Sequence, residues 1–215
     1  MRIAILTANI GNTGDEIYPL VQQTEDYELF YYTESTLPFP LPNLDNRMKG
    51  KYFKTQAHKF LNHDIFIWID GSIEVISKEF VKICCRTLKN ADVVSSLHEQ
   101  RKSPYDELEY IIDQMKYGNR YLLKRYARQP LYKEYDFYRE QGLPKTYPLY
   151  NCFFFARWNM PEVNTAFDTW WDTITRFSNF DQTQFSYAAW EHGLKVLPLQ
   201  TQDLFIRNKH NGYNL

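Results

Sequence analysis

Short apolar runs alternate along this chain with longer stretches in which apolar residues recur with a helical period. The short runs are typical of buried strands and the periodic stretches of amphipathic helices. The strands predicted in this way cover residues 2–9, 27–33, 64–70, 92–97, 149–156 and 195–199. The predicted helices cover residues 46–61, 78–88, 104–126, 131–141, 165–177 and 181–192. Because strands and helices alternate, the pattern predicts an α/β fold with a mostly parallel central sheet.

The bulk properties of the chain narrow its class. No repeat, linker or shift in composition divides the 215 residues, so we expect one domain over residues 1–215. The formal net charge of -1 favours no nucleic-acid partner, and no apolar run approaches the roughly 20 residues of a membrane span. Met1 leads directly into the first strand pattern, so we expect no signal peptide. Three cysteines, two of them adjacent, form no disulfide framework, so we expect a cytoplasmic protein.

The segment from Asp64 to Val75 carries the most informative local pattern. Its apolar run ends abruptly at Asp70, and Gly71 and Ser72 follow. An acid at the carboxyl end of a buried strand lies where open α/β sheets bind their ligands. The hard carboxylate oxygens of Asp70 suit Mg²⁺ or Mn²⁺, whereas the alternative is an Asp that caps a β-turn.

A metal ion at Asp70 would need a further ligand. Ser72 stands where the second acid of an Asp-x-Asp motif would be, and a lone carboxylate binds a divalent cation weakly. We expect His210 as that ligand, because a histidine in the C-terminal tail can fold over the site and imidazole suits Mn²⁺ better than Mg²⁺. The alternative is an exposed tail histidine with no ligand.

The helix predicted before the Asp70 strand has basic residues at spacings of four, three and four. These spacings place four side chains on one helical face: Arg47, Lys51, Lys54 and His58. A basic stripe that leads into the Asp70 strand is well placed to receive a diphosphate. The alternative is a solvated helix face.

Asp181 opens a predicted helix and is followed three positions later by Gln184. A carboxylate held at a helix start could accept the proton of an acceptor hydroxyl, which would make Asp181 a general base. The alternative is a capping box that Asp181 forms with Gln184 and that needs no function.

A polar group follows the strand predicted over residues 92–97. Its members could line a sugar or acceptor pocket, or they could be helix-start and surface charges: His98, Arg101, Tyr105 and Glu107.

Five groups of residues follow one another in order: Arg47, Lys54 and His58; Trp68 to Gly71; His98, Arg101 and Tyr105 to Glu107; Tyr138, Arg139 and Gly142 to Pro144; and Trp170, Asp181, Gln182 and Phe185. With these groups, residues 45–190 resemble a glycosyltransferase-like family of plants and large DNA viruses, whose chlorella-virus members glycosylate a capsid protein. The resemblance implies a Rossmann-like GT-A fold, a UDP-sugar donor and Mn²⁺. It also implies inverting transfer, with rhamnose or another hexose moved to a hydroxyl of a glycan or glycoprotein. It further implies that the chain is the N-terminal domain of a longer protein.

The resemblance also implies roles for the candidate residues. The end of the first strand would hold the base and ribose through Thr7, Ala8, Asn9 and Gly11. The diphosphate and metal would be held by Arg47, Lys51, Lys54, His58, Asp70, Gly71 and His210. Gln182 would join the pocket of His98, Arg101, Tyr105 and Glu107, and Asp181 would be the base. The chain departs from the family at Phe180, where relatives often carry a basic residue. It also departs at Ser72, which breaks the acid pair of the GT-A fold.

Two rivals stay open at this point. One is a retaining glycosyltransferase of the same fold. The other is a non-catalytic module that binds a nucleotide or carbohydrate, which the missing second acid at Ser72 favours. A glycosidase is disfavoured, because nothing in the sequence sets Asp70 against Asp181 as an opposed pair.

Overall fold

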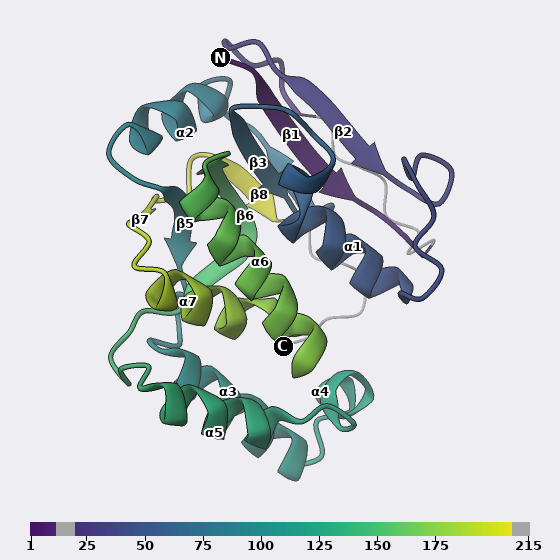
Figure 1. Cartoon of the computed structure of the whole chain (residues 1–215), viewed down its shortest axis with the longest axis vertical. Coiled ribbons are helices and arrows are strands. Elements are labelled where there is room, and N and C mark those ends of the chain that lie inside the picture. The colour runs from purple at the N-terminus through teal and green to yellow at the C-terminus, as the bar shows by residue number, and fades with distance from the viewer. Residues whose placement is uncertain (12–19, 208–215) are drawn as a thin grey trace.

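The structure is a computed structural model and describes residues 1–11 and 20–207. Its centre is a six-stranded sheet in the order β2-β1-β3-β6-β5-β7 (Figure 1). The strands are β1 (Ile3–Ala8), β2 (Glu28–Tyr32), β3 (Ile65–Ile69), β5 (Val93–Leu97), β6 (Tyr150–Trp158) and β7 (Val196–Pro198). Only β6 runs against its neighbours β3 and β5, while the β1–β2, β1–β3 and β5–β7 pairs are parallel. The predicted α/β class and mostly parallel sheet are confirmed.

Helices and a small second sheet surround this centre. The helices are α1 (Asn46–Thr55), α2 (Phe80–Leu88), α3 (Pro104–Lys116), α4 (Arg120–Tyr126), α5 (Leu131–Gln141), α6 (Pro161–Arg176) and α7 (Asp181–Glu191), with one 3₁₀ turn, η1 (Ala57–Lys59). The second sheet pairs β4 (Ile73–Val75) with β8 (Phe205–Arg207) and was not predicted, because strands of three residues carry little pattern.

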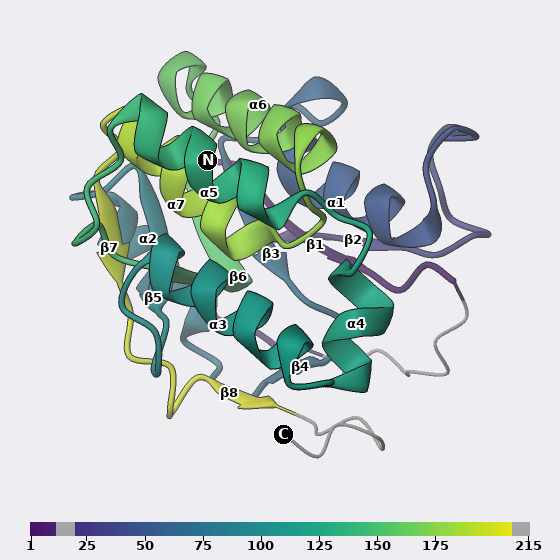
Figure 2. The same ribbon diagram turned by 90° about the horizontal axis from the view of Figure 1, so that it is seen from below.

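Both faces of the central sheet are buried, because successive apolar side chains of a strand point to opposite faces of the sheet. On β3, Phe66 and Trp68 pack with α1, α6 and α7, whereas Ile67 points to α2, β4 and β8. Figure 2 shows α6 on one side of the sheet and β8 on the other. A third apolar cluster joins α3, α4 and α5 beside the sheet. Helices α1, α6 and α7 therefore cover one face of the sheet, and α2 with the small second sheet covers the other.

Several helix boundaries follow local signals. Ser103 is the N-cap of α3, as predicted, and forms a capping box with Asp106. α5 ends as predicted at Gly142, which has a φ of +83°. The helix predicted over residues 104–126 is instead two helices, because Gly118, with a φ of +82°, ends α3 and Asn119 caps α4. α6 begins earlier than predicted, with Pro161 in its first turn.

None of the helices in residues 1–11 and 20–207 is long and apolar enough to cross a bilayer. The three cysteines, Cys84, Cys85 and Cys152, are free thiols, and two of them are buried.

Candidate functional site

Asp70 and Gly71 leave β3 beside the end of the parallel neighbour β1. A Cβ atom at Gly71 would lie 3.1 Å from the carbonyl oxygen of Ala8 and 3.9 Å from Oγ1 of Thr7. This close approach favours glycine at position 71, because a side chain there would require the Ala8 carbonyl to move. The structure therefore brings four predicted site residues together at one edge of the sheet: Thr7, Ala8, Asp70 and Gly71.

The carboxylate of Asp70 is held by two donors. Its Oδ1 accepts a hydrogen bond of 2.7 Å from Nε1 of Trp68 and one of 3.1 Å from Nζ of Lys54. The Lys54 ammonium also lies over the Trp68 ring, 5.5 Å from its centroid. Trp68 was not predicted as a site residue, because nothing local shows that its indole N–H turns toward Asp70.

The same ammonium reaches a second carboxylate, which comes from α7. Nζ of Lys54 lies 2.8 Å and Nζ of Lys51 2.5 Å from Oδ2 of Asp181. Burial alone would raise the pKa of Asp181, but the charges of Lys51 and Lys54 outweigh burial and hold that pKa well below its usual range. Burial alone would lower the pKa of Lys54, but the charges of Asp181 and Asp70 raise it above its usual value. We call these four residues, Lys51, Lys54, Asp70 and Asp181, the lysine–aspartate cluster.

The capping-box alternative for Asp181 is wrong. The N-cap of α7 is Phe180, and no side chain caps it. The amide of Gln184 instead donates to the carbonyl oxygen and hydroxyl of Ser178, at 3.0 and 2.8 Å. The Asp181 side chain is therefore used by the two lysines, while its carbonyl oxygen accepts a 2.9 Å hydrogen bond from the buried indole of Trp170.

Two further contacts hold the turn that leads into α7. Nη1 of Arg47 donates to Oδ1 of Asn179 at 3.3 Å, which ties this turn to α1. Nε2 of Gln182 donates to Oδ1 of Asn151 at 3.2 Å, and the Asn151 amide donates to the carbonyl of Leu97 at the end of β5. Asn151 and Asn179 were not predicted as site residues, because neither belongs to a recognisable motif.

The predicted basic stripe of four residues is wrong in its last member. α1 ends at Thr55, so only Arg47, Lys51 and Lys54 remain on one helix, and His58 lies in η1. His58 bridges Asp168 and Arg157, at 3.0 Å from each. Burial and the charge of Arg157 lower the pKa of His58 to about 4, so the ring is neutral at pH 7. The structure does not bring His58 to the lysine–aspartate cluster.

The residues after β5 form a separate cluster. Nη2 of Arg101 lies 3.0 Å from Nε2 of His98, and its Nε donates to the carboxylate of Glu107. Burial raises the pKa of Glu107 more than Arg101 lowers it. Tyr105 is buried among α3 and α5, where its hydroxyl donates to the carbonyl of Leu143 at 2.9 Å. Of the four residues, Tyr105 is thus part of the core and does not line an open pocket.

The remaining residues predicted for the base and ribose lie beyond β1. The N–H of Asn9 donates to the carbonyl of Tyr32 at 2.9 Å. Gly11 has a φ of +108°, a value that favours glycine, and its N–H donates to the Glu34 carboxylate. A Cβ atom at Gly11 would lie 3.0 Å from Nδ2 of Asn46, so this loop passes the start of α1.

The described residues do not fit a divalent cation at Asp70. Oδ1 of Asp70 already accepts from Trp68 and from an ammonium, whose charge repels a metal ion. No group of three or more His, Cys, Asp or Glu residues that could hold a metal occurs within residues 1–11 and 20–207. His210, the other expected ligand, lies outside the described residues.

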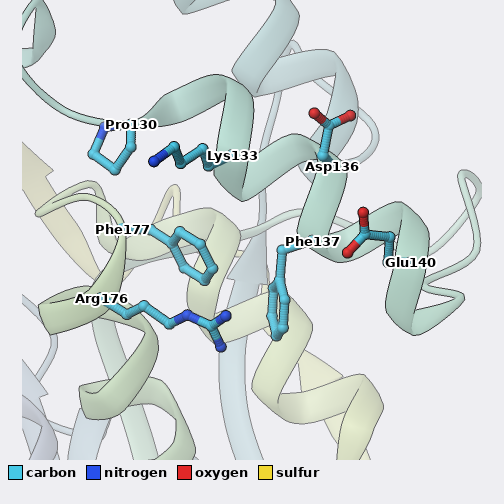
Figure 3. A pocket seen from close by; sticks show the side chains of 7 residues that line it. All are labelled: Pro130, Lys133, Asp136, Phe137, Glu140, Arg176 and Phe177. Carbon is cyan, nitrogen blue, oxygen red and sulfur yellow. The ribbon is translucent and has the colours of Figure 1, made fainter.

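A cavity of about 530 Å³ lies elsewhere, between α5 and the end of α6 (Figure 3). Pro130, Lys133, Asp136, Phe137, Glu140, Arg176 and Phe177 line it. The Arg176 guanidinium lies 4.8 Å from the ring centroids of Phe137 and Phe177. No residue predicted for the site lines this cavity.

Comparison with one curated plant protein agrees with the resemblance seen in the sequence. In the curated "Probable hexosyltransferase MUCI70" of Arabidopsis thaliana, the matching region is 29% identical and covers 68% of this chain. The match covers 25% of that protein, so the chain spans about a quarter of its length. The structure is also similar to the crystal structure of mouse xyloside xylosyltransferase 1 in its apo form. That similarity has a TM-score of 0.49 and 8% identity, and it covers 94% of this chain and 86% of the other.

The family assignment rests on a match that covers most of the chain. Residues 38–208 match the family described as the TOD1/MUCI70 glycosyltransferase-like domain. The matched range contains the whole lysine–aspartate cluster and the turn that carries Asp181. This chain therefore belongs to the TOD1/MUCI70 glycosyltransferase-like domain family.

Proposed function

We propose that the chain is a GT-A glycosyltransferase domain that acts as a hexosyltransferase. It would move a sugar from a nucleoside diphosphate to a hydroxyl of a glycan or glycoprotein. Family membership and the name of the plant relative support this proposal. The observation that carries the proposal is the position of Lys54. This buried cation lies between Asp70, at the carboxyl end of β3, and Asp181, at the start of α7.

The lysines of α1 would neutralise the donor's diphosphate. A leaving diphosphate gains negative charge as the bond to the sugar breaks, and fixed cations stabilise that charge. Lys51 and Lys54 are held in place by Asp181, and Arg47 lies one helical turn earlier on α1. Thr7, Ala8, Asn9 and Gly11 would contact the base and ribose beside this position.

Asp181 would act as the general base. The acceptor oxygen would attack the anomeric carbon, its proton would pass to Asp181, and the bond to the diphosphate would break with its electron pair on the leaving oxygen. With Lys51 and Lys54 bound to its carboxylate, Asp181 is a weak base in the structure. An entering diphosphate would compete for both ammonium groups and so make Asp181 more basic.

The finer expectations belong to this proposal as well. They are a UDP-linked donor with rhamnose or another hexose, inverting transfer, a viral capsid acceptor and a cytoplasmic location. Gln182, His98, Arg101 and Glu107 would lie on the acceptor side, because Gln182 is linked through Asn151 to the end of β5. No step above depends on a metal ion, since the described donors around Asp70 do not fit one.

A non-catalytic nucleotide-binding module is the second candidate. The observations that favour it are Ser72 in place of a second acid and the full engagement of Asp181 Oδ2 by two lysines. Such a module would bind UDP and would not turn over any UDP-sugar.

The experiment is titration calorimetry with UDP, with and without Mn²⁺, on the wild type, Asp70→Ala and Asp64→Ala. Asp64 is a matched control, because it lies at the opposite end of the same strand and is exposed. Tighter UDP binding in Asp70→Ala alone would support the donor site at Lys54, because Asp70 competes with the diphosphate for that ammonium group. Loss of Mn²⁺-dependent UDP binding in Asp70→Ala would instead support a metal ion at Asp70. UDP binding without turnover of any UDP-hexose would favour the module, and no UDP binding under either condition would overturn the UDP donor.

A further inference from the structure

Glu134 is a buried carboxylate outside the lysine–aspartate cluster. It lies on α5 and is 0% exposed. Three hydroxyl groups donate to it: Tyr138 Oη at 2.8 Å and Thr183 Oγ1 at 2.6 Å to Oε1, and Ser178 Oγ at 2.7 Å to Oε2. Burial raises its pKa to about 7, against the opposite effect of these hydrogen bonds. A buried acid is costly unless it is hydrogen-bonded, and these three hydroxyl groups supply the hydrogen bonds that Glu134 needs.

Two of these donors lie on either side of the turn that leads into α7. Ser178 precedes that turn and Thr183 follows it, on the first turn of the helix. Between them lie Asn179, which contacts Arg47, and Asp181, which contacts both lysines. Asn179 and Asp181 therefore lie between two residues, Ser178 and Thr183, that are hydrogen-bonded to Glu134.

The hydroxyl of Ser178 explains why an acid occupies this position. Its oxygen accepts hydrogen bonds from Nε2 of Gln184 at 2.8 Å and from the N–H of Phe180 at 3.4 Å. Both lone pairs of the hydroxyl are then used, and it has only its proton to offer. A carboxylate accepts that proton on one oxygen and the protons of Tyr138 and Thr183 on the other, whereas a glutamine that turned its carbonyl oxygen to Ser178 would face those two hydroxyls with its NH₂.

We propose that Glu134 is a positioning residue of the candidate active site, which fixes Asp181 by anchoring both ends of the Ser178–Thr183 turn. The inference rests on the proposed function, because it assigns Asp181 a part in turnover. Glu134 does not touch the lysine–aspartate cluster itself. It acts through Ser178 and Thr183.

This arrangement separates turnover from donor binding. The cations come from α1 and Asp70 follows β3, and neither element contacts Glu134 through the hydrogen bonds described above. Loosening the turn should displace Asp181 and leave the lysines on α1. A misplacement of about 1 Å in a reacting group can cost on the order of 10²-fold in rate.

The first test reads the turn directly, by hydrogen–deuterium exchange with mass spectrometry on the full chain. In Glu134→Gln, we expect amides of residues 178–184 to exchange about tenfold faster or more, with α1 and β3 unchanged. The control is Glu140→Gln, an exposed acid on the same helix that lines the cavity of Figure 3. Unchanged exchange in residues 178–184, or equally faster exchange across the whole chain, would overturn the inference.

The second test connects the turn to catalysis. We expect Glu134→Gln to lower kcat for UDP-glucose turnover by about ten- to a hundredfold. Its affinity for UDP should stay within about threefold of wild type, because no hydrogen bond described above joins Glu134 to α1 directly and the lysines stay on that helix. A merely structural role would lower the unfolding temperature and leave kcat unchanged well below it, and that outcome would overturn the inference.

A milder variant covers the case in which Glu134→Gln does not fold. Thr183→Val removes one of the three donors and keeps the side-chain volume. It should change exchange and kcat in the same direction by a smaller factor, and no change in either would overturn the inference. A wild type that neither binds UDP nor turns over a UDP-sugar would overturn the proposed function, while exchange in residues 178–184 would still decide whether Glu134 holds the turn.

Discussion

The Nζ atom of Lys54 lies 2.8 Å from Oδ2 of Asp181, although 127 positions separate the two residues. The same ammonium lies 3.1 Å from Oδ1 of Asp70. The buried ammonium group of Lys54, on α1, thus bridges two carboxylates: Asp70, which follows β3, and Asp181, which opens α7. An anionic ligand that enters this edge of the sheet must compete with both acids for the charge of Lys54.

Replacing Lys54 should weaken nucleotide binding. We expect Lys54→Met to lower UDP affinity by about ten- to a hundredfold, since a hydrogen bond to a charged group contributes on the order of 1.5–3 kcal/mol. The variant also leaves Asp70 without its cation, so that its charge repels the diphosphate. Calorimetry with UDP measures the change. Lys59→Met is the control, because Lys59 is exposed and pairs with Asp168 instead. Equal UDP affinity in Lys54→Met and wild type would contradict this prediction.

Removing the charge of Asp181 should affect turnover and spare binding. We expect Asp181→Asn to reduce kcat by about 10²–10⁴-fold, the usual contribution of a general base. UDP affinity should be kept or raised, because Lys51 and Lys54 lose a competing carboxylate. Steady-state kinetics with a UDP-hexose and an acceptor give the answer, with Asp172→Asn on the exposed side of α6 as control. A fall of less than about tenfold in a folded variant would remove Asp181 as the base.

Gly71 should not tolerate a side chain. A Cβ atom there would lie 3.1 Å from the carbonyl oxygen of Ala8, which belongs to a rigid strand. We expect Gly71→Ala to lower the free energy of unfolding by about 1–3 kcal/mol and to weaken UDP binding. Gly50→Ala is the matched control, since no atom lies within 4 Å of its added Cβ on α1. That variant should gain about 0.5–1 kcal/mol. Denaturant titrations measure the free energy of unfolding of both variants and of wild type. Equal stability of Gly71→Ala and wild type would show that the end of β1 shifts to accommodate the methyl group.

The buried Glu134 should make stability depend on pH. Its pKa rises from 4.5 to about 7 on folding, so the folded protein binds this proton more tightly than the unfolded chain does. The stabilising contribution is complete below pH 4.5 and is lost as pH rises through about 7. The wild type should therefore lose roughly 3 kcal/mol relative to Glu134→Gln over this window, because one pKa unit corresponds to about 1.4 kcal/mol.

The pH dependence of stability has to be compared between wild type and Glu134→Gln, because His58 also contributes to it. Burial lowers its pKa to about 4, so its contribution to stability grows as pH rises from about 4 to 6.5 and opposes that of Glu134. The His58 contribution is common to wild type and Glu134→Gln and cancels in their difference. The hydroxyls that face Glu134 do not titrate in this window, since burial raises the pKa of Tyr138 well above its usual value. Unfolding curves at several pH values measure the difference, and a flat difference would contradict a titrating Glu134.

Local patterns were sufficient where a signal lies within one element. The apolar run that ends at Asp70 predicted β3 and the place where it ends, and the limits of α5 follow from its apolar period and Gly142. The spacing of basic residues did not predict the position of His58, because that prediction depended on one helix continuing past Thr55, where α1 ends. Tyr105 stands beside polar residues in the sequence, yet it packs into the core of α3 and α5.

The sequence by itself determined the α/β class, most element positions and the residue types from which a site could be built. These depend on contacts between near neighbours in the chain, whose spacing can be read directly. Only the tertiary structure decided that β6 runs against the sheet, that Lys54 joins Asp70 to Asp181, and that Glu134 holds the turn before α7. These contacts join residues that are far apart in the chain, and no local period encodes which buried charge will meet which.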